Sequence, residues 1–219
     1  MRIYLRLSKN SALIPFNYQA FLTGAFHKWM GMENVEHGRV SFYSFSWLQN
    51  VEITKAGINL KRDSYFFISA YDEVLIKMIM KGIMTDPSVC FGSFVSAVDI
   101  EETPNFSAVQ RFSIASPVLV RRFEGEKDNH IVYHDERASD YLTETMQRKL
   151  SLARLPADNM KVSFDLTYQH PRTKVITYKG IGNRVNICPV IVEGTPEQVA
   201  FAWDVGVGNS TGIGFGALK

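Results

Sequence analysis

The amino-acid sequence predicts an α+β protein made of two consecutive units that share one element order: strand, helix, strand, strand, helix, strand. Short segments of alternating or β-branched and aromatic residues indicate the strands, because side chains alternate between the two faces of a strand. Longer segments with apolar residues three and four positions apart indicate the helices. The order of these segments recurs in the second half of the chain, although the halves share no residue-level repeat.

In the first half, strands are expected at residues 2–8, 40–48, 65–71 and 89–100. The first helix is expected within residues 14–30, where an apolar stripe at helical spacing is formed by Tyr18, Leu22, Ala25 and Trp29. The second helix is expected over residues 72–84, with Asp72 as its N-cap and an apolar stripe of Val74, Leu75, Met78, Ile79 and Ile83.

In the second half, strands are expected at residues 112–123, 160–169, 184–192 and 213–219, the first of them interrupted or at a sheet edge because of Pro117. A helix over residues 139–154 would begin at Ser139 as N-cap and stop before Pro156. A shorter helix over residues 195–203 has Thr195 and Gln198 at the spacing of a capping box, with Pro196 in its first turn.

This element order is that of the ferredoxin-like fold, so the sequence predicts two such units in tandem. We place the N-terminal unit at residues 1–107 and the C-terminal unit at residues 108–219. The join lies in "EETPNFSAVQ", which is not a Ser/Gly-rich linker, so we expect the two units to pack closely.

The composition excludes several functional classes. No apolar run approaches the about 20 residues of a membrane span, and the N-terminus lacks the apolar core of a signal peptide. We therefore expect a cytoplasmic protein that binds no membrane. The two cysteines, Cys90 and Cys188, are too few and too far apart for a disulfide scaffold or a zinc site. The acidic residues lack the pattern of a metal-binding loop, so we expect neither a metal nor a cofactor.

Glycines crowd the end of the sequence in "VGVGNSTGIGFGALK", at Gly206, Gly208, Gly212, Gly214 and Gly216. Glycines let consecutive backbone N–H groups point at an anion, and such loops often pass close to phosphate. The alternative is a turn needed for close packing between the last helix and the last strand. A dinucleotide-binding loop or a P-loop is excluded, because those loops follow a strand and open a helix, whereas here a helix comes first.

A helix, G-x-G, five residues, G-x-G and an apolar strand resemble the glycine-rich signature of the CRISPR repeat-associated RNA-binding superfamily, with Gly206, Gly208, Gly214 and Gly216 in the matching positions. The segment "IPFNYQAFLTGAF" resembles the opening of the first helix in the Cas-six family, the endoribonucleases that cut CRISPR precursor transcripts. The resemblance covers nearly the whole chain.

The resemblance implies a metal-independent endoribonuclease that binds a CRISPR repeat across the cleft between the two units. Attack by the RNA 2′-hydroxyl would leave a 5′-hydroxyl and a 2′,3′-cyclic phosphate. The repeat RNA is the expected partner, and other CRISPR-associated proteins or a second copy of the chain are further candidates. Three alternatives stay open: a non-catalytic RNA-binding subunit of an interference complex, a domain of a longer CRISPR fusion protein, and a ligand-binding regulatory module in which the glycines serve packing alone.

Histidine suits general acid–base catalysis because its pKa lies near neutral pH. Helical geometry places His27 roughly opposite the apolar stripe of the first helix, where an ordinary exposed histidine is the alternative. Relatives carry a catalytic tyrosine or histidine at this position, and their acid–base histidine falls near the loop of His37. The resemblance therefore implies His37 as the principal acid or base and His27 as its partner. The lysine that often follows is absent, so Arg39 or Lys28 would stabilise the charged phosphorane.

The segment "HPRTKVITYKGIGNR" carries Arg172, Lys174, Lys179 and Arg184 without an acidic residue between them. A solvated hairpin is the simplest interpretation of such a charge run. Beside the glycine signature, these side chains become candidates to follow RNA phosphates. Arg121 and Arg122 could extend the same surface.

Overall fold

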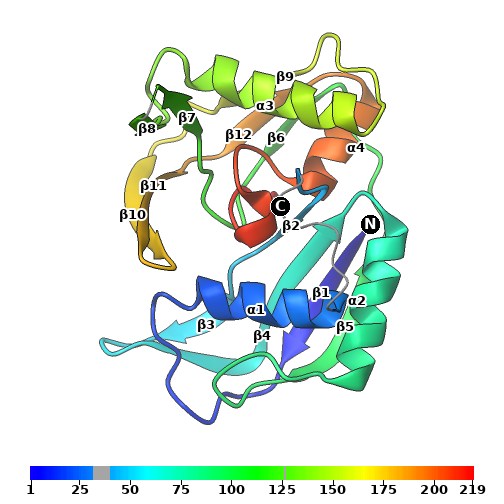
Figure 1. Ribbon diagram of the computed structural model, residues 1–219, viewed down its shortest axis with the longest axis vertical. Coiled ribbons are helices and arrows are strands. Elements are labelled where there is room, and N and C mark those ends of the chain that lie inside the picture. The colour runs from blue at the N-terminus through cyan, green and yellow to red at the C-terminus, as the bar shows by residue number, and fades with distance from the viewer. Residues whose placement is uncertain (32–39, 126) are drawn as a thin grey trace.

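The computed structural model describes residues 1–31, 40–125 and 127–219, which form two units stacked along the long axis of the molecule (Figure 1). The N-terminal unit is the lower one in this view, and the C-terminal unit lies above it. Both chain ends lie near the middle, where the Arg2 guanidinium donates a hydrogen bond to the carbonyl of Leu218.

The N-terminal unit is an antiparallel sheet with two helices packed on it. Its elements are β1 (Arg2–Leu7), α1 (Gln19–Met30), β2 (Tyr43–Phe45), β3 (Gln49–Ile53), β4 (Ile58–Ala70), α2 (Glu73–Thr85) and β5 (Val95–Glu101). The strand order is β2-β4-β1-β5, with β3 pairing with β4 as an additional strand. The first strand therefore lies between the third and the fourth main strands, which is the ferredoxin-like arrangement.

The C-terminal unit repeats this arrangement with two hairpins added. Its elements are β6 (Val109–Phe112), β7 (Arg121–Glu124), β8 (Lys127–His130), α3 (Ala138–Leu152), β9 (Lys161–Phe164), β10 (Arg172–Tyr178), β11 (Ile181–Ile187), β12 (Val190–Glu193), α4 (Pro196–Val205) and the 3₁₀ turn η1 (Thr211–Ile213). The central sheet has the order β6-β12-β9, while β7–β8 and β10–β11 form separate hairpins. An antiparallel bridge between Ile114 and Leu218 takes the place of the fourth strand. The two units confirm the predicted fold class, and the predicted boundary at residue 107 falls between β5 and β6.

Two of the predicted helix caps are confirmed and one is wrong. The Asp72 carboxylate accepts a hydrogen bond from the Val74 amide at 2.8 Å, and Thr195 and Gln198 form the reciprocal capping box at the start of α4. Ser139 is not an N-cap, because α3 already begins at Ala138. The preceding turn is instead held by the Asp135 carboxylate, which accepts the Arg137 amide at 2.9 Å.

Several of the predicted strands are shorter than expected or are divided. The strand expected at residues 160–169 is only β9, and the one expected at residues 184–192 is divided between β11 and β12. The strand expected at residues 40–48 is reduced to β2, because the chain then crosses to the other unit, where the Trp47 amide donates to the Ala115 carbonyl. Of the strand expected at residues 112–123, only its two ends fall in strands, in β6 and β7, and residues 113–120 around Pro117 form none; β5 begins only at Val95. Residues 213–219 form no strand, because Gly214 and Gly216 have φ values of 88° and 65°, outside the extended region.

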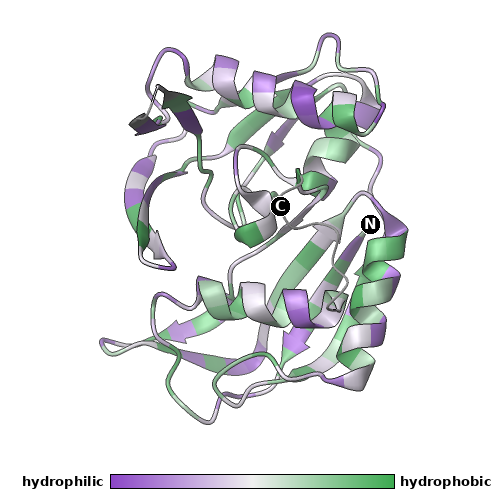
Figure 2. Ribbon diagram, viewed as in Figure 1, coloured by the Kyte–Doolittle hydropathy of each residue, from purple (hydrophilic) through white to green (hydrophobic). Residues whose placement is uncertain are grey.

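Each unit has its own hydrophobic core. In the N-terminal unit α1, α2 and the sheet enclose one buried cluster, and in the C-terminal unit α3, α4 and the central sheet enclose another. Figure 2 shows α3 alternating between hydrophilic and hydrophobic colours, as expected for a helix with one face in the core.

The seam between the units is built around a buried arginine. The Arg2 side chain is 1% exposed, and its guanidinium lies 3.9 Å from the ring centroid of Phe67 and 3.5 Å from that of Trp203. It also donates to the Ser69 hydroxyl and to the carbonyl of Leu218. Because Phe67 and Ser69 belong to the N-terminal sheet and Trp203 to α4, this one side chain joins the two units.

Replacing Arg2 by lysine is expected to lower the free energy of unfolding by about 1–3 kcal/mol, since an ammonium can neither stack between two rings as a plane nor supply the same donors. Urea unfolding followed by tryptophan fluorescence measures this change. Arg6→Lys is the matched control: Arg6 lies on the same strand but is exposed and pairs with Asp99, so its substitution should change stability by less than about 0.5 kcal/mol. Equal losses in the two variants would contradict the role given to Arg2.

Candidate functional site

Residues 206–216, here called the glycine loop, run from the end of α4 back between the two units (Figure 1). The loop closes on itself through a hydrogen bond from the Val207 amide to the Gly216 carbonyl at 2.9 Å. It is joined to the segment before β7, because the Asn209 amide donates to the Leu119 carbonyl at 2.7 Å and the Gly216 amide to the Pro117 carbonyl at 2.8 Å. These amides are therefore used within the protein.

Close packing explains why the loop needs glycine. Gly206, Gly208, Gly214 and Gly216 all have positive φ values, which side chains disfavour. A Cβ at Gly208 would overlap the carbonyl oxygen of Leu119, and a Cβ at Gly214 would enter the ring of Phe45. Because Leu119 belongs to the C-terminal unit and Phe45 to the N-terminal unit, the loop touches both. Close packing, which the sequence analysis gave as the alternative to phosphate binding, is thus observed at these glycines.

A buried lysine holds the loop to α3 and α4. The Lys149 ammonium donates to the carbonyls of Val205 and Gly206, both at 3.2 Å, and to the hydroxyl of Thr211 at 3.1 Å. The two carbonyls end α4, where the helix dipole places partial negative charge. Burial lowers the pKa of Lys149 to about 7 from 10.5, because none of its described partners is a carboxylate.

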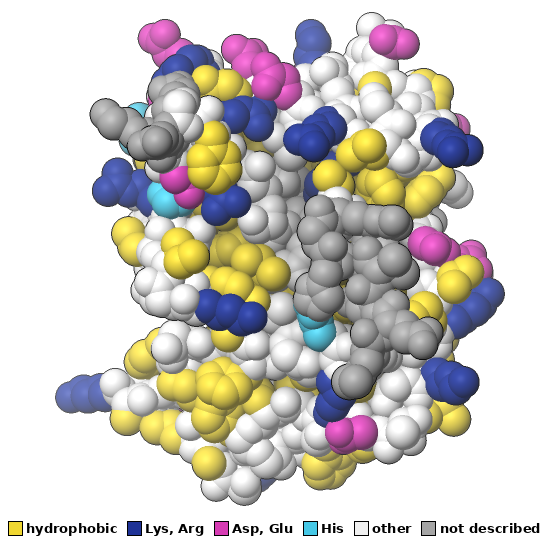
Figure 3. Space-filling model, in the orientation of Figure 1, with side chains coloured by type: hydrophobic (Ala, Val, Ile, Leu, Met, Phe, Trp, Pro, Cys, Tyr) yellow, Lys and Arg dark blue, Asp and Glu magenta, His cyan; other side chains and the backbone are white. Residues whose placement is uncertain are grey.

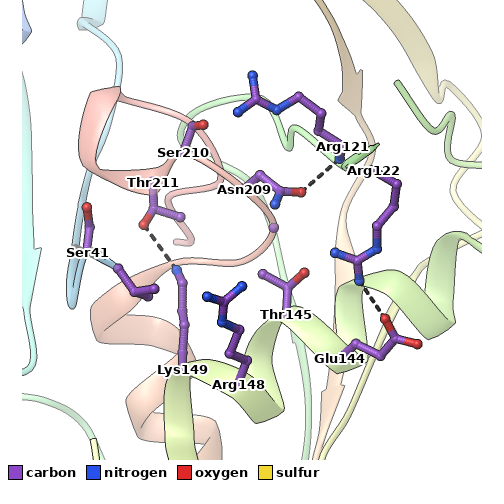
Figure 4. A pocket seen from close by; sticks show the side chains of 12 residues that line it. Ser41, Arg121, Arg122, Glu144, Thr145, Arg148, Lys149, Asn209, Ser210 and Thr211 are labelled. Atoms are coloured by element: carbon purple, nitrogen blue, oxygen red, sulfur yellow. Dashed lines mark hydrogen bonds and ion pairs between the residues drawn. The ribbon is translucent and has the colours of Figure 1, made fainter. Parts of the chain in front are cut away.

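Beside the loop lies a pocket of about 450 Å³ that collects positive charge (Figure 4). Its charged lining consists of Arg121, Arg122, Arg148, Lys149 and Glu144. Glu144 is already paired with the Arg122 guanidinium at 2.8 Å. Arg148 is exposed and forms no hydrogen bond or ion pair with the described part of the chain. A pocket with this excess of cations and several hydroxyl and amide side chains suits an anion with many acceptor oxygens.

Arg121 and Arg122, which the sequence singles out, come from β7 and lie in this pocket. The Arg121 amide donates to the Asn209 side chain at 2.8 Å, which ties β7 to the glycine loop. The Arg122 guanidinium lies 4.6 Å from the ring centroid of Tyr141 on α3 and donates to its carbonyl. Sequence reasoning missed Arg148 and Lys149. Lys149 lies seven residues after Leu142, on the apolar stripe of α3, and a lysine at a core position is the signal that could have revealed it.

His27 lies on a row of α1 that points toward the glycine loop. Gln19, Thr23 and His27 are four residues apart and therefore share one side of the helix. The Gln19 amide donates to the carbonyl of Ile213 in the loop at 2.5 Å, and Gln19 and Thr23 are buried whereas His27 is half-buried. The buried face of α1 is thus wider than predicted, since Phe26 is also fully buried and makes an edge contact with the His27 ring. Of the three side chains in this row, only His27 is partly exposed to solvent.

Of the other three predicted catalytic residues, the structure describes only Lys28. His37 and Arg39 lie outside the described residues. The Lys28 ammonium pairs with the Asp86 carboxylate at 2.8 Å and donates to the Ser88 carbonyl at 2.6 Å, so it joins α1 to the segment after α2. Lys28 and Ser88 hold the pKa of Asp86 well below its ordinary value.

The basic hairpin β10–β11 divides its charges between two faces. Both turn residues, Lys179 and Gly180, have positive φ values, as a tight two-residue turn requires. Arg172 and Lys174 share a face with Val185, which is buried against the body of the protein. Arg184 stands opposite Val175 and so points to the other face. Figure 3 shows Lys and Arg side chains spread over the upper half of the visible face, with several Asp and Glu side chains at its top edge.

The described residues form neither a metal-ligand cluster nor a membrane-spanning helix. No group of three or more His, Cys, Asp or Glu side chains within them could hold a metal ion. None of the helices formed by those residues is long and apolar enough to cross a membrane.

Comparisons with known proteins agree on one family. Residues 101–219 match the family model "CRISPR associated protein Cas6, C-terminal". The chain is 26% identical over 239 residues to the "Putative CRISPR-associated endoribonuclease-like protein Cas6" of Pyrococcus furiosus, covering 100% of this chain and 98% of that protein. It is 25% identical to the solved structure of a Cas6-related gene product of the same organism, with a TM-score of 0.85 and coverage of 100% and 97%. A second solved structure, of a RAMP protein binding different RNA substrates, is 24% identical with a TM-score of 0.84 and coverage of 100% and 98%.

Gly208→Ala is expected to lower the free energy of unfolding by about 2–4 kcal/mol, because the substitution combines a strained φ with overlap on the Leu119 carbonyl. Denaturant unfolding of the variant and the parent measures the difference. Gly24→Ala in α1 is the control, since a Cβ there meets no atom within 4 Å and alanine favours the helix by about 1 kcal/mol. A loop that tolerates Gly208→Ala as well as α1 tolerates Gly24→Ala would disprove the packing role.

Lys149 makes stability depend on pH in a defined direction. Its pKa is lower in the folded state than in the unfolded state, so the unfolded chain binds more protons between pH 7 and pH 10.5. The penalty of burying this lysine is complete below pH 7 and decreases as the pH rises, by at most about 1.4 kcal/mol per pH unit. Lys149→Met removes the titration. The difference in unfolding free energy between parent and variant, measured in urea from pH 6 to pH 10, should therefore change in favour of the parent as pH rises. A difference independent of pH would show that Lys149 does not titrate in this range.

Proposed function

Because the chain belongs to the Cas6 family, written Cas-six above, we propose that it is an endoribonuclease that cleaves CRISPR precursor RNA within the repeats. The observation that carries the proposal is the cationic pocket at the glycine loop, whose charged residues all lie in the part of the chain matched by the family model. RNA is the polyanion that this pocket would bind, because each phosphate group of RNA can accept several hydrogen bonds from arginine side chains.

The proposed reaction needs no metal. The RNA 2′-oxygen attacks the adjacent phosphorus while a base removes its proton, the bond from phosphorus to the 5′-oxygen breaks, and an acid protonates that oxygen. The products are a 2′,3′-cyclic phosphate and a 5′-hydroxyl. General acid–base catalysis of this kind contributes about 10²–10⁴-fold in rate.

His37 and His27 are the proposed acid and base. His27 is half-buried and lies two turns along α1 from Gln19, whose side-chain amide reaches the glycine loop. His37 precedes Val40 by three positions in the sequence, and Val40 lines the cationic pocket. Arg39 is our first choice to stabilise the phosphorane, because the Lys28 ammonium is already paired with Asp86. Arg39 also supplies a planar guanidinium that can bind two phosphate oxygens at once.

A second candidate function is RNA binding without cleavage. One observation favours it: the described lining of the cationic pocket contains no histidine. On this alternative the pocket and the hairpin would hold the repeat, and the product would be an RNA–protein complex instead of cut RNA.

A cleavage assay on a labelled repeat RNA from the same genome, in EDTA, separates the two functions. We expect one cut, lost when the nucleotide before it is 2′-deoxy and slowed by about 10²–10⁴-fold in His37→Ala, with a smaller or equal loss in His27→Ala. Arg39→Ala and Lys28→Ala run beside them, and only Arg39→Ala should slow the reaction markedly. Tight binding without any cut would support the binding alternative, and a cut that requires added Mg²⁺ would refute the proposed chemistry.

A further inference from the structure

A second pocket, of about 460 Å³, lies between the two units and shares no lining residue with the cationic pocket. Its lining combines Trp47 of the N-terminal unit with residues 114–117, with the start of β10 and with the end of β11. The walls are apolar at Ile114, Pro117 and Ile187, and the rim carries Arg172 and Lys174. A pocket of this size can hold a small planar molecule.

The Trp47 ring is fixed in place before any ligand binds. Its indole N–H donates to the Gly214 carbonyl of the glycine loop at 2.8 Å, and its backbone amide donates to the Ala115 carbonyl at 3.1 Å. The Tyr18 ring meets it edge-on, with the ring centroids 6.3 Å apart. The side chain is nevertheless only half-buried. A rigid, partly exposed indole is a ready surface for stacking, because little side-chain entropy is lost when a flat ligand binds.

The two cations at the rim are available. Arg172 and Lys174 are exposed, and neither forms a hydrogen bond or an ion pair with the described residues. Their alternation along β10 places both on the hairpin face turned toward the protein body, together with the buried Val185. No Asp or Glu is among the described residues that line this pocket. The rim is thus an electrostatic match for phosphates on either side of a bound base.

We propose that this pocket binds one unpaired nucleobase of the RNA, stacked on Trp47, with its flanking phosphates on Arg172 and Lys174. The inference rests on the proposed RNA-binding function and adds that part of the bound RNA is single-stranded. Bases inside a duplex have both faces covered by neighbouring pairs, so only an unpaired base can enter a pocket and stack on an aromatic side chain. The hydrogen bond from Trp47 to Gly214 joins this base pocket to the glycine loop.

An abasic scan tests the proposal. A set of labelled repeat RNAs from the same genome, each lacking one base, is titrated against the parent protein and against Trp47→Ala. For the parent we expect one position, or two adjacent ones, where loss of the base weakens binding about 5- to 100-fold, the effect of one base–aromatic stack. In Trp47→Ala the intact RNA should bind this much more weakly, and removal of that same base should have no further effect.

Control variants keep the test independent of folding. Trp47→Phe retains a ring and should keep most of the position dependence, and thermal unfolding checks each Trp47 variant. Lys174→Ala should weaken binding and reduce its salt dependence by about one phosphate contact. Lys77→Ala is its matched control, since Lys77 is an exposed lysine on α2 that pairs with Glu73 and lines neither pocket, and its substitution should weaken binding much less.

The outcomes separate this inference from the proposed function. RNA that is bound, or cut, with the same abasic profile in the parent and in Trp47→Ala would overturn the base pocket and leave the proposed function intact. Binding of a fully paired repeat duplex as tightly as the single strand would also overturn it. A parent protein that binds no repeat RNA would overturn both.

Discussion

The position of the glycine loop constrains where the neighbouring elements can lie. The loop fills the space between the two units with backbone alone, since a Cβ at Gly208 or Gly214 would overlap Leu119 on one side or Phe45 on the other. The units can therefore approach only as closely as a bare backbone allows. The Trp47 indole, the Asn209 side chain and the Gln19 amide all bond to the loop or belong to it. Base pocket, cationic pocket and α1 are thus positioned by one segment.

The charges around the glycine loop favour the binding of a polyanion. Lys149 is buried against carbonyl oxygens at the end of α4 without a carboxylate partner among the described residues, and Arg148 beside it lacks a described partner. Positive charge assembled in this way is unfavourable in the empty protein, because like charges repel and the buried one is desolvated. A bound polyanion would supply opposite charge and so offset both costs. Affinity for RNA and order in the loop are therefore expected to rise together, because loop residues line the proposed RNA-binding pocket.

Local patterns in the sequence predicted local features well. The capping box of Thr195 and Gln198, the Asp72 cap and the repeated element order all depend on residues close together in the chain, and the structure confirms them. Features that depend on contacts between residues far apart in the sequence could not be predicted from it. The last predicted strand is reduced to one bridge by glycine conformations that its packing partners impose. The face on which Arg184 lies depends on hairpin register, and the availability of Lys28 depends on Asp86, which lies 58 positions later in the sequence. The roles of His37 and Arg39 stay predictions.

The buried Arg2 has a consequence for how the chain is made. Its hydrogen bond to Leu218 spans 216 positions, so on a ribosome the first strand emerges long before its partner exists. Domains generally fold as units during synthesis, N-terminal first, and the N-terminal sheet can form while Arg2 is still solvated. Stacking on Trp203 and bonding to Leu218 then withdraw the guanidinium from water only when these two residues have been made. Docking of the two units is in this sense a late, separate step, and a ribosome stalled before α4 would carry a folded first unit with its arginine still exposed.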